Sequence, residues 1–272
     1  MAEIDMPFPI SDLEFDRLRT LVKETTGISL AESKRTLMVS RLASRLRARG
    51  IRTFLDYYKL ITAPSEGDEL QAAIDLITTN ETSFFREADH FRILREYIAR
   101  QRPIAFPFRV WSAASSSGEE AYSIAMVLAE VLGSAEWEIL GTDISTRVLE
   151  RASRGVYPME RSCTIPRDAL HRFCLKGQGQ YEGMFMISKT LRERVQFLQM
   201  NLCRPIPQVG PFELIFLRNV LIYFETEEKR RIVESVIQRL KPNGLLIVGH
   251  SESLNGVTDR VVPVQPTVYR AN

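Results

Sequence analysis

Hydrophobic residues recur at helical spacing through the first part of the chain, up to about residue 78. Ser11-Asp-Leu-Glu14 matches a capping box, and Gly27 predicts the end of the first helix. The apolar face of this helix is formed by Phe15, Leu18, Leu21 and Val22. Further helices are predicted near residues 31–49, 53–62 and 68–78. The pattern therefore predicts an all-α N-terminal domain over residues 1–79.

From about residue 104 the pattern changes to short apolar runs that alternate with helical segments, which is typical of a parallel sheet. Strands are predicted at residues 110–113, 137–141, 195–200, 212–217 and 245–248, with an edge strand within 263–269. One helix presents an apolar face made of Ile232, Val233, Val236, Ile237 and Leu240. Lys241-Pro-Asn-Gly244 predicts a turn after it. The sequence therefore predicts an α/β, Rossmann-like domain over residues 80–272.

One segment interrupts this alternation. Arg172–Lys176 and Gly183–Ser188 flank Gly177-Gln-Gly179, which predicts two short strands around a glycine-bearing loop. A hairpin of this size is too small to stand alone. We therefore expect a small antiparallel β subdomain, at about residues 160–194, inserted into the α/β domain.

Composition and charge are those of an ordinary globular protein. The chain has 272 residues, 44% hydrophobic and 26% charged, and its net charge of +2 argues against a general polyanion binder. The cysteines are Cys163, Cys174 and Cys203, an odd number without CxxC spacing, which argues against a disulfide framework and against zinc. The N-terminus lacks an apolar signal core, and no apolar run approaches the ~18 residues of a membrane span. We expect a cytoplasmic protein without membrane insertion.

The turn after the first predicted strand indicates a ribose-bearing ligand. Residues 112–117 are serine and alanine, followed by Gly118, so the glycines of a dinucleotide fingerprint are missing. About 25 residues on, the second predicted strand ends in Asp143, where an acid can bind ribose hydroxyls. A ligand with a ribose but no pyrophosphate, such as S-adenosylmethionine, fits this turn best. The alternative for Asp143 is a helix cap.

Four segments in order resemble the chemotaxis receptor methyltransferases. They are Asn80–Arg86, Trp111–Tyr122, Phe216–Phe224 and Gly249-His-Ser-Glu252. The resemblance covers nearly the whole chain, and it implies a Rossmann-like S-adenosylmethionine-dependent methyltransferase domain. It also implies transfer of a methyl group to glutamate side chains of methyl-accepting receptors, with S-adenosylhomocysteine as product and sensory adaptation as the outcome.

The resemblance also implies roles for individual residues. Cofactor-binding residues are expected at Asn80, Thr82, Arg86, Glu120, Asp143, Asn201, Leu202, Arg218 and Asn219, and Arg86 and Tyr223 are expected at the catalytic end. Several alternatives stay open. Asn80 and Thr82 could cap a helix, Arg86 could be solvated, and Tyr223 could be a core residue. Ser117-x-x-Glu120 is itself a capping box, and Glu120 is favoured over Glu119 as the cofactor contact.

Basic residues are concentrated between Ser33 and Leu55, which contain seven Lys or Arg and no acid. Arg41, Arg45 and Arg49 share one helix face. Like charges at this spacing repel by ~0.2–0.5 kcal/mol per pair, so the face suggests an acidic partner. The resemblance supplies the glutamate-bearing helices of the receptor, whereas the absence of interleaved aromatic residues argues against nucleic acid. In some members the hairpin also binds a C-terminal receptor tether peptide, and the Gly177–Gly179 loop is compatible with that.

Metal binding is not expected, because His90, His171 and His250 do not cluster in the sequence. His250 could simply be a hydrogen-bonding residue at a strand end. Two other functions remain open. One is a methyltransferase for another acceptor, and the other is a catalytically silent module that binds cofactor and receptor.

Overall fold

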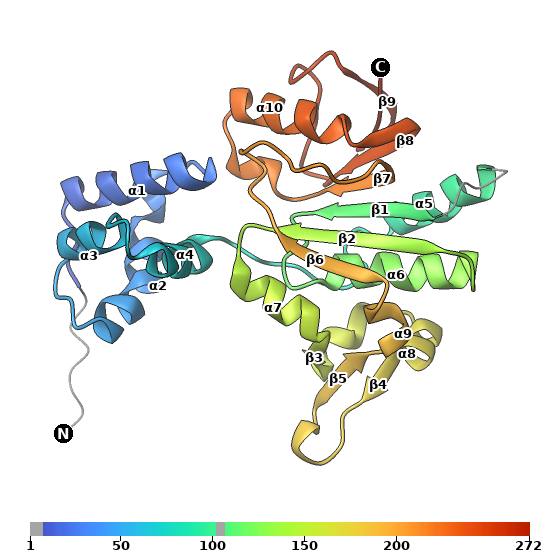
Figure 1. Cartoon of the computed structure of the whole chain (residues 1–272), viewed down its shortest axis with the longest axis horizontal. Coiled ribbons are helices and arrows are strands. Elements are labelled where there is room, and N and C mark those ends of the chain that lie inside the picture. The colour runs from blue at the N-terminus through green and yellow to red at the C-terminus, as the bar shows by residue number, and fades with distance from the viewer. Residues whose placement is uncertain (1–7, 102–106) are drawn as a thin grey trace. The chain divides into compact units, whose positions relative to one another are not determined.

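The computed structural model describes residues 8–101 and 107–272 (Figure 1). The chain divides into two units, residues 1–79 with 223–225 and residues 80–222 with 226–272. No helix within the described residues is long and apolar enough to cross a membrane.

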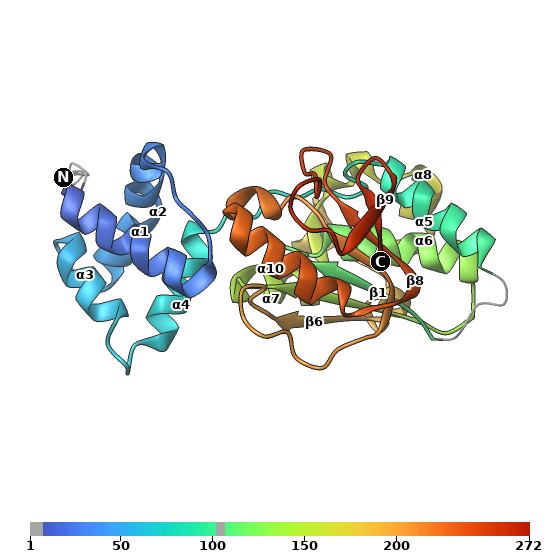
Figure 2. The same cartoon turned by 90° about the horizontal axis from the view of Figure 1, so that it is seen from above.

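The first unit is helical, as the sequence predicts (Figure 2). Its elements are α1 (Asp12–Thr26), η1 (Glu32–Lys34), α2 (Arg35–Ala48), α3 (Phe54–Ile61) and α4 (Gly67–Ile77). The predicted capping box is formed, since Ser11 Oγ accepts the Glu14 N–H and the Glu14 carboxylate accepts the Ser11 N–H. Gly27 ends α1 in the left-handed conformation, at φ 78°. The core is made of fully or nearly fully buried side chains, among them Phe15, Met38, Leu42, Leu46, Phe54 and Tyr57.

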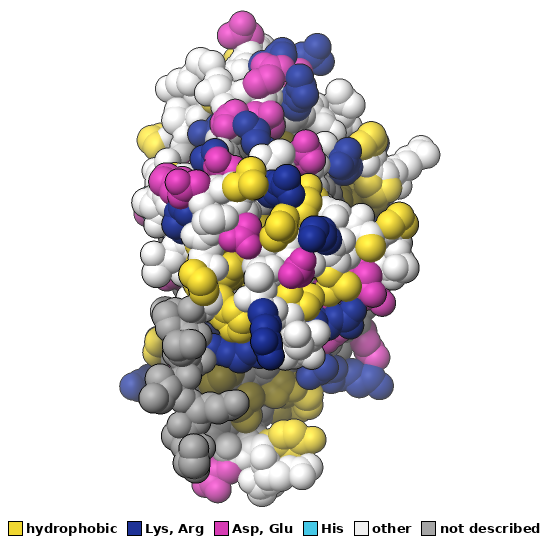
Figure 3. All heavy atoms as spheres, turned by 90° about the vertical axis from the view of Figure 1, so that its left-hand side faces the viewer, with side chains coloured by type: hydrophobic (Ala, Val, Ile, Leu, Met, Phe, Trp, Pro, Cys, Tyr) yellow, Lys and Arg dark blue, Asp and Glu magenta, His cyan; other side chains and the backbone are white. Residues whose placement is uncertain are grey.

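The three arginines on one face of α2 are bonded within this unit. Arg45 forms a bidentate pair with Glu69 of α4, at 2.9 Å and 2.5 Å, and Arg49 pairs with Glu66 at 2.6 Å. Arg41 donates to the backbone carbonyls of Ile77 and Thr78. Figure 3 shows basic side chains interspersed with acidic ones on the face that it displays. Glu66 and Glu69 therefore already relieve the repulsion along α2, so this repulsion no longer requires an external partner.

The second unit contains a seven-stranded sheet in the order β6-β2-β1-β7-β8-β10-β9. The first five strands in this order are parallel, whereas β10 pairs antiparallel with both of its neighbours, β8 and β9. The strands are β1 (Phe108–Ala113), β2 (Trp137–Asp143), β6 (Val195–Gln199), β7 (Phe212–Leu217), β8 (Leu240–Val248), β9 (Val261–Gln265) and β10 (Val268–Ala271). The Rossmann-like α/β prediction is confirmed.

Helices cover both faces of this sheet. They are α5 (Asp89–Arg100), α6 (Glu119–Leu132), α7 (Thr146–Arg154) and α10 (Thr226–Ile237). In Figure 1, α10 lies on the opposite side of the sheet from α6 and α7. All six residues of β7 are buried, as expected for a strand covered on both faces.

At the end of the chain, the predicted turn is wrong and the predicted edge strand is incomplete. The predicted turn at Lys241–Gly244 lies inside β8, and Leu240 begins that strand instead of extending the apolar face of α10. Leu240 pairs with Phe212, and a register irregularity with a positive φ of 64° at Asn243 absorbs the turn-like residues. The single predicted edge strand is a hairpin, in which β10 pairs with β8 and β9 forms the edge.

The inserted β subdomain has three strands in the order β3-β5-β4, one more than the sequence predicts. The extra strand, β3, has only three residues and ends at Pro158, so it gives little periodic signal. The elements of this segment are β3 (Val156–Pro158), η2 (Met159–Thr164), α8 (Arg167–Phe173), β4 (Cys174–Lys176), η3 (Gly179–Tyr181), β5 (Met184–Ile187) and α9 (Lys189–Arg192).

The pair between Arg45 and Glu69 generates a stability prediction. Glu69 is 4% exposed, also accepts the Tyr57 hydroxyl, and has its pKa lowered, chiefly by the Arg45 hydrogen bonds. Arg45→Ala should lower the free energy of unfolding of the helical unit by about 2–3 kcal/mol, because a buried carboxylate loses two charge-assisted bonds. Lys59→Ala breaks a pair with Asp56 that is exposed on both sides and should lower the free energy of unfolding far less. Urea unfolding of both variants measures the difference, and equal losses would contradict the account.

Candidate active site

The turn after β1 uses positive backbone φ angles instead of a run of glycines. Ala114, Ser116 and Gly118 have φ of 79°, 48° and 94°. A Cβ at Gly118 would lie 2.8 Å from Ala152 Cβ and 3.0 Å from the Tyr157 hydroxyl oxygen. Glycine is therefore required at this position by close packing within the protein, and not only for an approach to a ligand.

Asp143 at the end of β2 is buried and joins the two turns of the predicted ribose site. Its Oδ2 accepts the Ser116 N–H at 2.9 Å, and its Oδ1 accepts the Ser145 N–H at 3.0 Å. Ser145 is the N-cap residue of α7, so Asp143 supports the start of that helix without occupying the cap position. These two bonds fix the carboxylate at the carboxyl end of the sheet, where open α/β sheets bind ligands.

Arg218, directly after β7, is the central charged residue of the site. Its side chain is 2% exposed, and its guanidinium lies 2.8 Å from Glu120 Oε2 and 3.0 Å from Glu87 Oε2. It also donates to the Arg86 carbonyl oxygen at 2.6 Å. One arginine therefore joins β7, the start of α6 and the segment that precedes α5.

The two carboxylates on Arg218 have different pKa directions. Burial raises the pKa of Glu120 above its usual value, although Arg218 and the Ser112 hydroxyl, which donates at 2.7 Å, act in the other direction. Burial also acts to raise the pKa of Glu87, but Arg218 and the Asn219 amide outweigh it and the pKa is lowered. The cluster of Glu87, Glu120 and Arg218 thus combines two acids with one permanent cation.

Glu119 and Glu120 face different partners. Glu119 is fully buried and accepts from Arg161 Nη1 and from the Ser117 hydroxyl, each at 2.7 Å. Glu120 faces Arg218, so it does not form the capping box that Ser117-x-x-Glu120 suggests, and the N-cap residue of α6 is Gly118. This arrangement favours Glu120 over Glu119 as the residue on the ligand side.

The segment from Asn80 to Ala88 is tied to the turn after β1. The Asn80 carbonyl oxygen accepts the Ser116 hydroxyl at 2.9 Å, and the Thr82 carbonyl oxygen accepts from Arg161 at 3.2 Å. The N-cap residue of α5 is Ala88, so Asn80 and Thr82 do not cap that helix and this alternative is wrong. The half-buried Arg86 side chain donates to the Glu81 carbonyl oxygen at 3.1 Å.

Asn201, Leu202, Asn219 and Tyr223 are the other residues predicted to lie in the site. Asn201 and Leu202 follow β6, whose end is tied to Asp143 because the Met200 N–H donates to the Asp143 carbonyl oxygen at 2.9 Å. Asn219 adjoins Arg218, and its Nδ2 donates to Glu87 Oε1 at 3.2 Å. Tyr223 is grouped with the helical unit, where its carbonyl oxygen accepts the Ser29 N–H. The roles of Tyr223 and of the α2 arginines stay predictions.

Two residues of the site, Glu87 and Glu252, are missing from the sequence predictions. Glu87 directly follows Arg86, and this adjacency is the only sequence signal for it. Glu252 belongs to the Gly249-His-Ser-Glu252 segment but is not among the residues to which the resemblance assigns a role.

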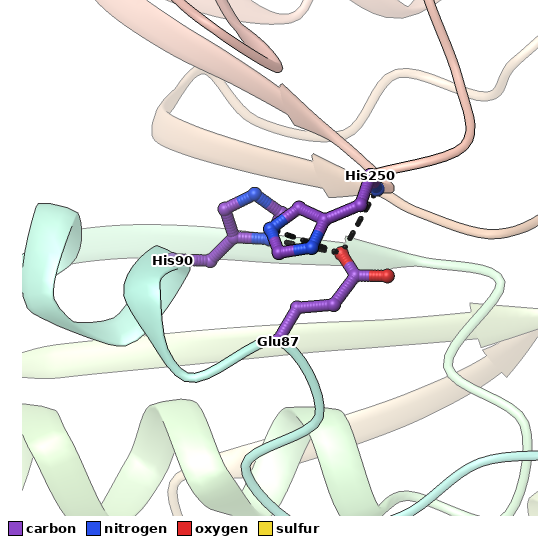
Figure 4. Close-up of side chains that lie close together, drawn as sticks. All are labelled: Glu87, His90 and His250. Carbon is purple, nitrogen blue, oxygen red and sulfur yellow. Dashed lines mark hydrogen bonds and ion pairs between the residues drawn. The ribbon is translucent and has the colours of Figure 1, made fainter.

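His90 and His250, although 160 positions apart in the sequence, lie together beside Glu87 (Figure 4). Their rings are 5.0 Å apart, and ligand atoms of all three residues lie within 4.8 Å of one another. His90 Nε2 lies 2.8 Å from the Thr267 hydroxyl, which itself donates to the Pro266 carbonyl oxygen, so we assign the His90 proton to Nε2.

The three residues are spaced as metal ligands could be, but Glu87 Oε2 already accepts from Arg218 and from the His250 N–H. A cation would lie beside a guanidinium, so the cluster is better explained as a support for Glu87.

Comparison with known families matches both units. The all-alpha domain of CheR methyltransferases matches residues 13–78, and their S-adenosylmethionine-binding domain matches residues 80–270. A chemotaxis protein methyltransferase of Escherichia coli K12 is 41% identical over 263 residues, which cover 96% of this chain and 91% of that protein. A chemotaxis protein methyltransferase of Salmonella typhimurium LT2 is 41% identical, with 99% and 93% covered. Chemotaxis protein methyltransferase 2 of Pseudomonas aeruginosa PAO1 is 41% identical, with 94% and 92% covered.

The buried histidine generates a pH prediction. Burial, helped by Arg218, lowers the pKa of His90 to about 4, against ~6.5 in an unfolded chain. Between these values the unfolded state binds a proton that the folded state does not. The free energy of unfolding should therefore fall as the pH decreases from about 6.5 to about 4, by up to ~1.4 kcal/mol per pH unit from this residue.

Urea unfolding of the wild type and of His90→Gln across this pH range gives the free energy of unfolding of each as a function of pH. The difference between the two curves measures the contribution of His90. The variant should show the shallower dependence. His171→Gln, at an exposed histidine, is the matched control for the substitution itself. Parallel curves for the wild type and His90→Gln would contradict the assignment.

Proposed function

The chain belongs to the CheR methyltransferase family, and we propose that it converts receptor glutamate side chains to methyl esters. Membership of this family carries S-adenosylmethionine-dependent methylation of chemotaxis receptors. The ester product and the roles given to individual residues are our proposal.

The observation that carries the proposal is the buried set of charges at the carboxyl ends of β1, β2 and β7. Asp143 is fixed by two backbone N–H groups, and Arg218 is held between Glu120 and Glu87. We assign the ribose hydroxyls of the cofactor to Asp143 and its adenine side to Asn201 and Leu202.

The methionine end of the cofactor is assigned to the residues around Arg218. They are Asn80, Thr82, Arg86, Glu120, Arg218 and Asn219. The N-terminus of α6 can also bind a carboxylate, because backbone N–H groups at a helix start are free to donate. Arg218 Nε is buried and has no hydrogen-bond partner among the described residues, so it can donate to a ligand acceptor.

The chemistry needs orientation more than proton transfer. A glutamate carboxylate is ionised at neutral pH, and the sulfonium is an activated methyl donor. A carboxylate oxygen attacks the methyl carbon in line, the C–O bond forms as the C–S bond breaks, and the electron pair stays on sulfur in S-adenosylhomocysteine. Positioning of this kind can supply ~7–11 kcal/mol in favourable cases. We propose that Arg86 and Tyr223 orient the acceptor carboxylate and the methyl group.

The receptor surface is proposed at α2 and at the β subdomain. Arg41, Arg45 and Arg49 carry positive charge toward acidic receptor helices, even though each is also bonded within the helical unit. The Gly177–Gly179 loop is compatible with a tether peptide that adds a strand to the subdomain. Because the acceptor helices of these receptors are cytoplasmic, we expect the protein in the cytoplasm.

The test of the ester product is transfer of radiolabelled methyl from S-adenosylmethionine to receptor-containing membranes. Carboxyl methyl esters hydrolyse in mild base, whereas N-methyl groups do not. We expect base-labile label on the receptor. Base-stable label would indicate another acceptor group, and absence of label despite S-adenosylhomocysteine binding would favour a silent binding module.

The different roles proposed for Arg86 and Arg45 give a further prediction. Arg86→Ala should reduce methyl transfer strongly, by about 100-fold if a misplaced reacting group is the cause. Arg45→Ala should reduce it far less at saturating receptor, provided the variant is assayed at a temperature where it is folded. Initial rates with radiolabelled cofactor measure both. Equal losses would contradict this assignment.

A further inference from the structure

The Gly249-His-Ser-Glu252 segment after β8 contains a buried carboxylate that the roles above do not use. Glu252 is 7% exposed. Its Oε2 accepts the backbone N–H groups of Asn219 and Gly249, and its Oε1 accepts the N–H of Leu221, each at 2.7 Å. Three charge-assisted bonds from one side chain therefore hold two separate loops.

These bonds begin where the sheet ladder stops. β7 and β8 are parallel neighbours, and Leu217 and Val248 are their last paired residues. Beyond this pair the two segments form no further ladder pairs, and buried backbone N–H groups that leave a sheet need new acceptors. Glu252 supplies those acceptors to N–H groups of both segments.

Asn219 is held in an uncommon conformation at this point. Its φ is 55°, in the left-handed region, and its Nδ2 donates to Glu87 Oε1. Gly249 packs against it so closely that a Cβ at position 249 would lie 2.5 Å from Asn219 Nδ2, 2.9 Å from Glu252 Oε2 and 3.0 Å from Asn219 N. Both the glycine and the glutamate of the segment therefore determine where the Asn219 amide lies.

We infer that Glu252 is a positioning residue, which fixes the Asn219 amide for cofactor binding through the main chain, and that Gly249 leaves the space this requires. The inference rests on the proposed function, because it needs Asn219 at the cofactor. In the Gly249-His-Ser-Glu252 segment, Glu252 and Gly249 therefore position Asn219, whereas His250 donates its backbone N–H to Glu87.

A matched control is present at the other end of the same strands. Glu213, in β7, is also 7% exposed, and it accepts the Arg109 N–H at 2.7 Å and the Lys241 ammonium. It stabilises the same pair of strands but lies away from their carboxyl ends. Glu213→Gln therefore reports what the loss of a buried, backbone-bonded carboxylate does to the protein in general.

The experiment is calorimetric titration of S-adenosylhomocysteine into the full-length wild type, Glu252→Gln, Glu213→Gln, Asn219→Ala and the Glu252→Gln/Asn219→Ala double variant. Glutamine keeps the shape of Glu252, but its NH₂ group meets an N–H donor. We expect Glu252→Gln to weaken binding about 10-fold and Glu213→Gln less than about 2-fold. The double variant should bind no more weakly than Asn219→Ala, because Glu252 acts through Asn219.

Gly249→Ala is the second variant, and it displaces Asn219 without removing the carboxylate. It should also weaken binding, and its effect should also vanish in the Asn219→Ala background. This variant keeps the inference testable if Glu252→Gln does not fold.

Several outcomes would overturn the inference. Additive effects of Glu252→Gln and Asn219→Ala, or equal effects of Glu252→Gln and Glu213→Gln, would reduce Glu252 to a general stabilising role. A normal affinity in Asn219→Ala would remove the residue through which Glu252 acts. Failure of the wild type to bind S-adenosylhomocysteine would instead reject the proposed function, and that result is distinct from the others.

Discussion

The site depends on the burial of one guanidinium between two carboxylates. Arg218 joins Glu120, Glu87 and the Arg86 carbonyl oxygen, and so connects three segments that are far apart in the chain. A buried charge is tolerated only when it is paired and hydrogen-bonded, and the removal of one partner leaves the others uncompensated. The loops at this end of the sheet are therefore constrained by electrostatics as well as by packing.

Arg218 acts on the pKa of both acids. Burial raises the pKa of Glu120 above its usual value although Arg218 acts against it, whereas Arg218 and the Asn219 amide keep the pKa of Glu87 below its usual value. The β7 and β8 loops, held by Glu252, keep the Asn219 amide beside this cluster.

Local signals in the sequence predicted most of the fold. The capping box at Ser11–Glu14 and the glycine stop at Gly27 predicted α1, and the apolar residues of 212–217 predicted the strand that forms β7. The failures arise where tertiary pairing overrides local preference. Lys241–Gly244 has the composition of a turn, but it lies in β8 because Leu240 pairs with Phe212.

Some residues of the candidate site stand out in the sequence because they lie at strand ends, as Asp143 does at the end of β2 and Arg218 directly after β7. Partners from distant segments leave no local pattern. His90 and His250 meet only in the folded chain, and neither Glu87 nor Glu252 has a periodic signal. The sequence shows that one face of α2 is basic, but it does not show that Glu66 and Glu69 pair with Arg49 and Arg45 on that face.

The most direct test of the proposed site is a crystal structure with S-adenosylhomocysteine bound. We predict that the ribose hydroxyls bond to the Asp143 carboxylate while Arg218 still bridges Glu120 and Glu87. A ligand bound away from the carboxyl ends of β1 and β2 would contradict it.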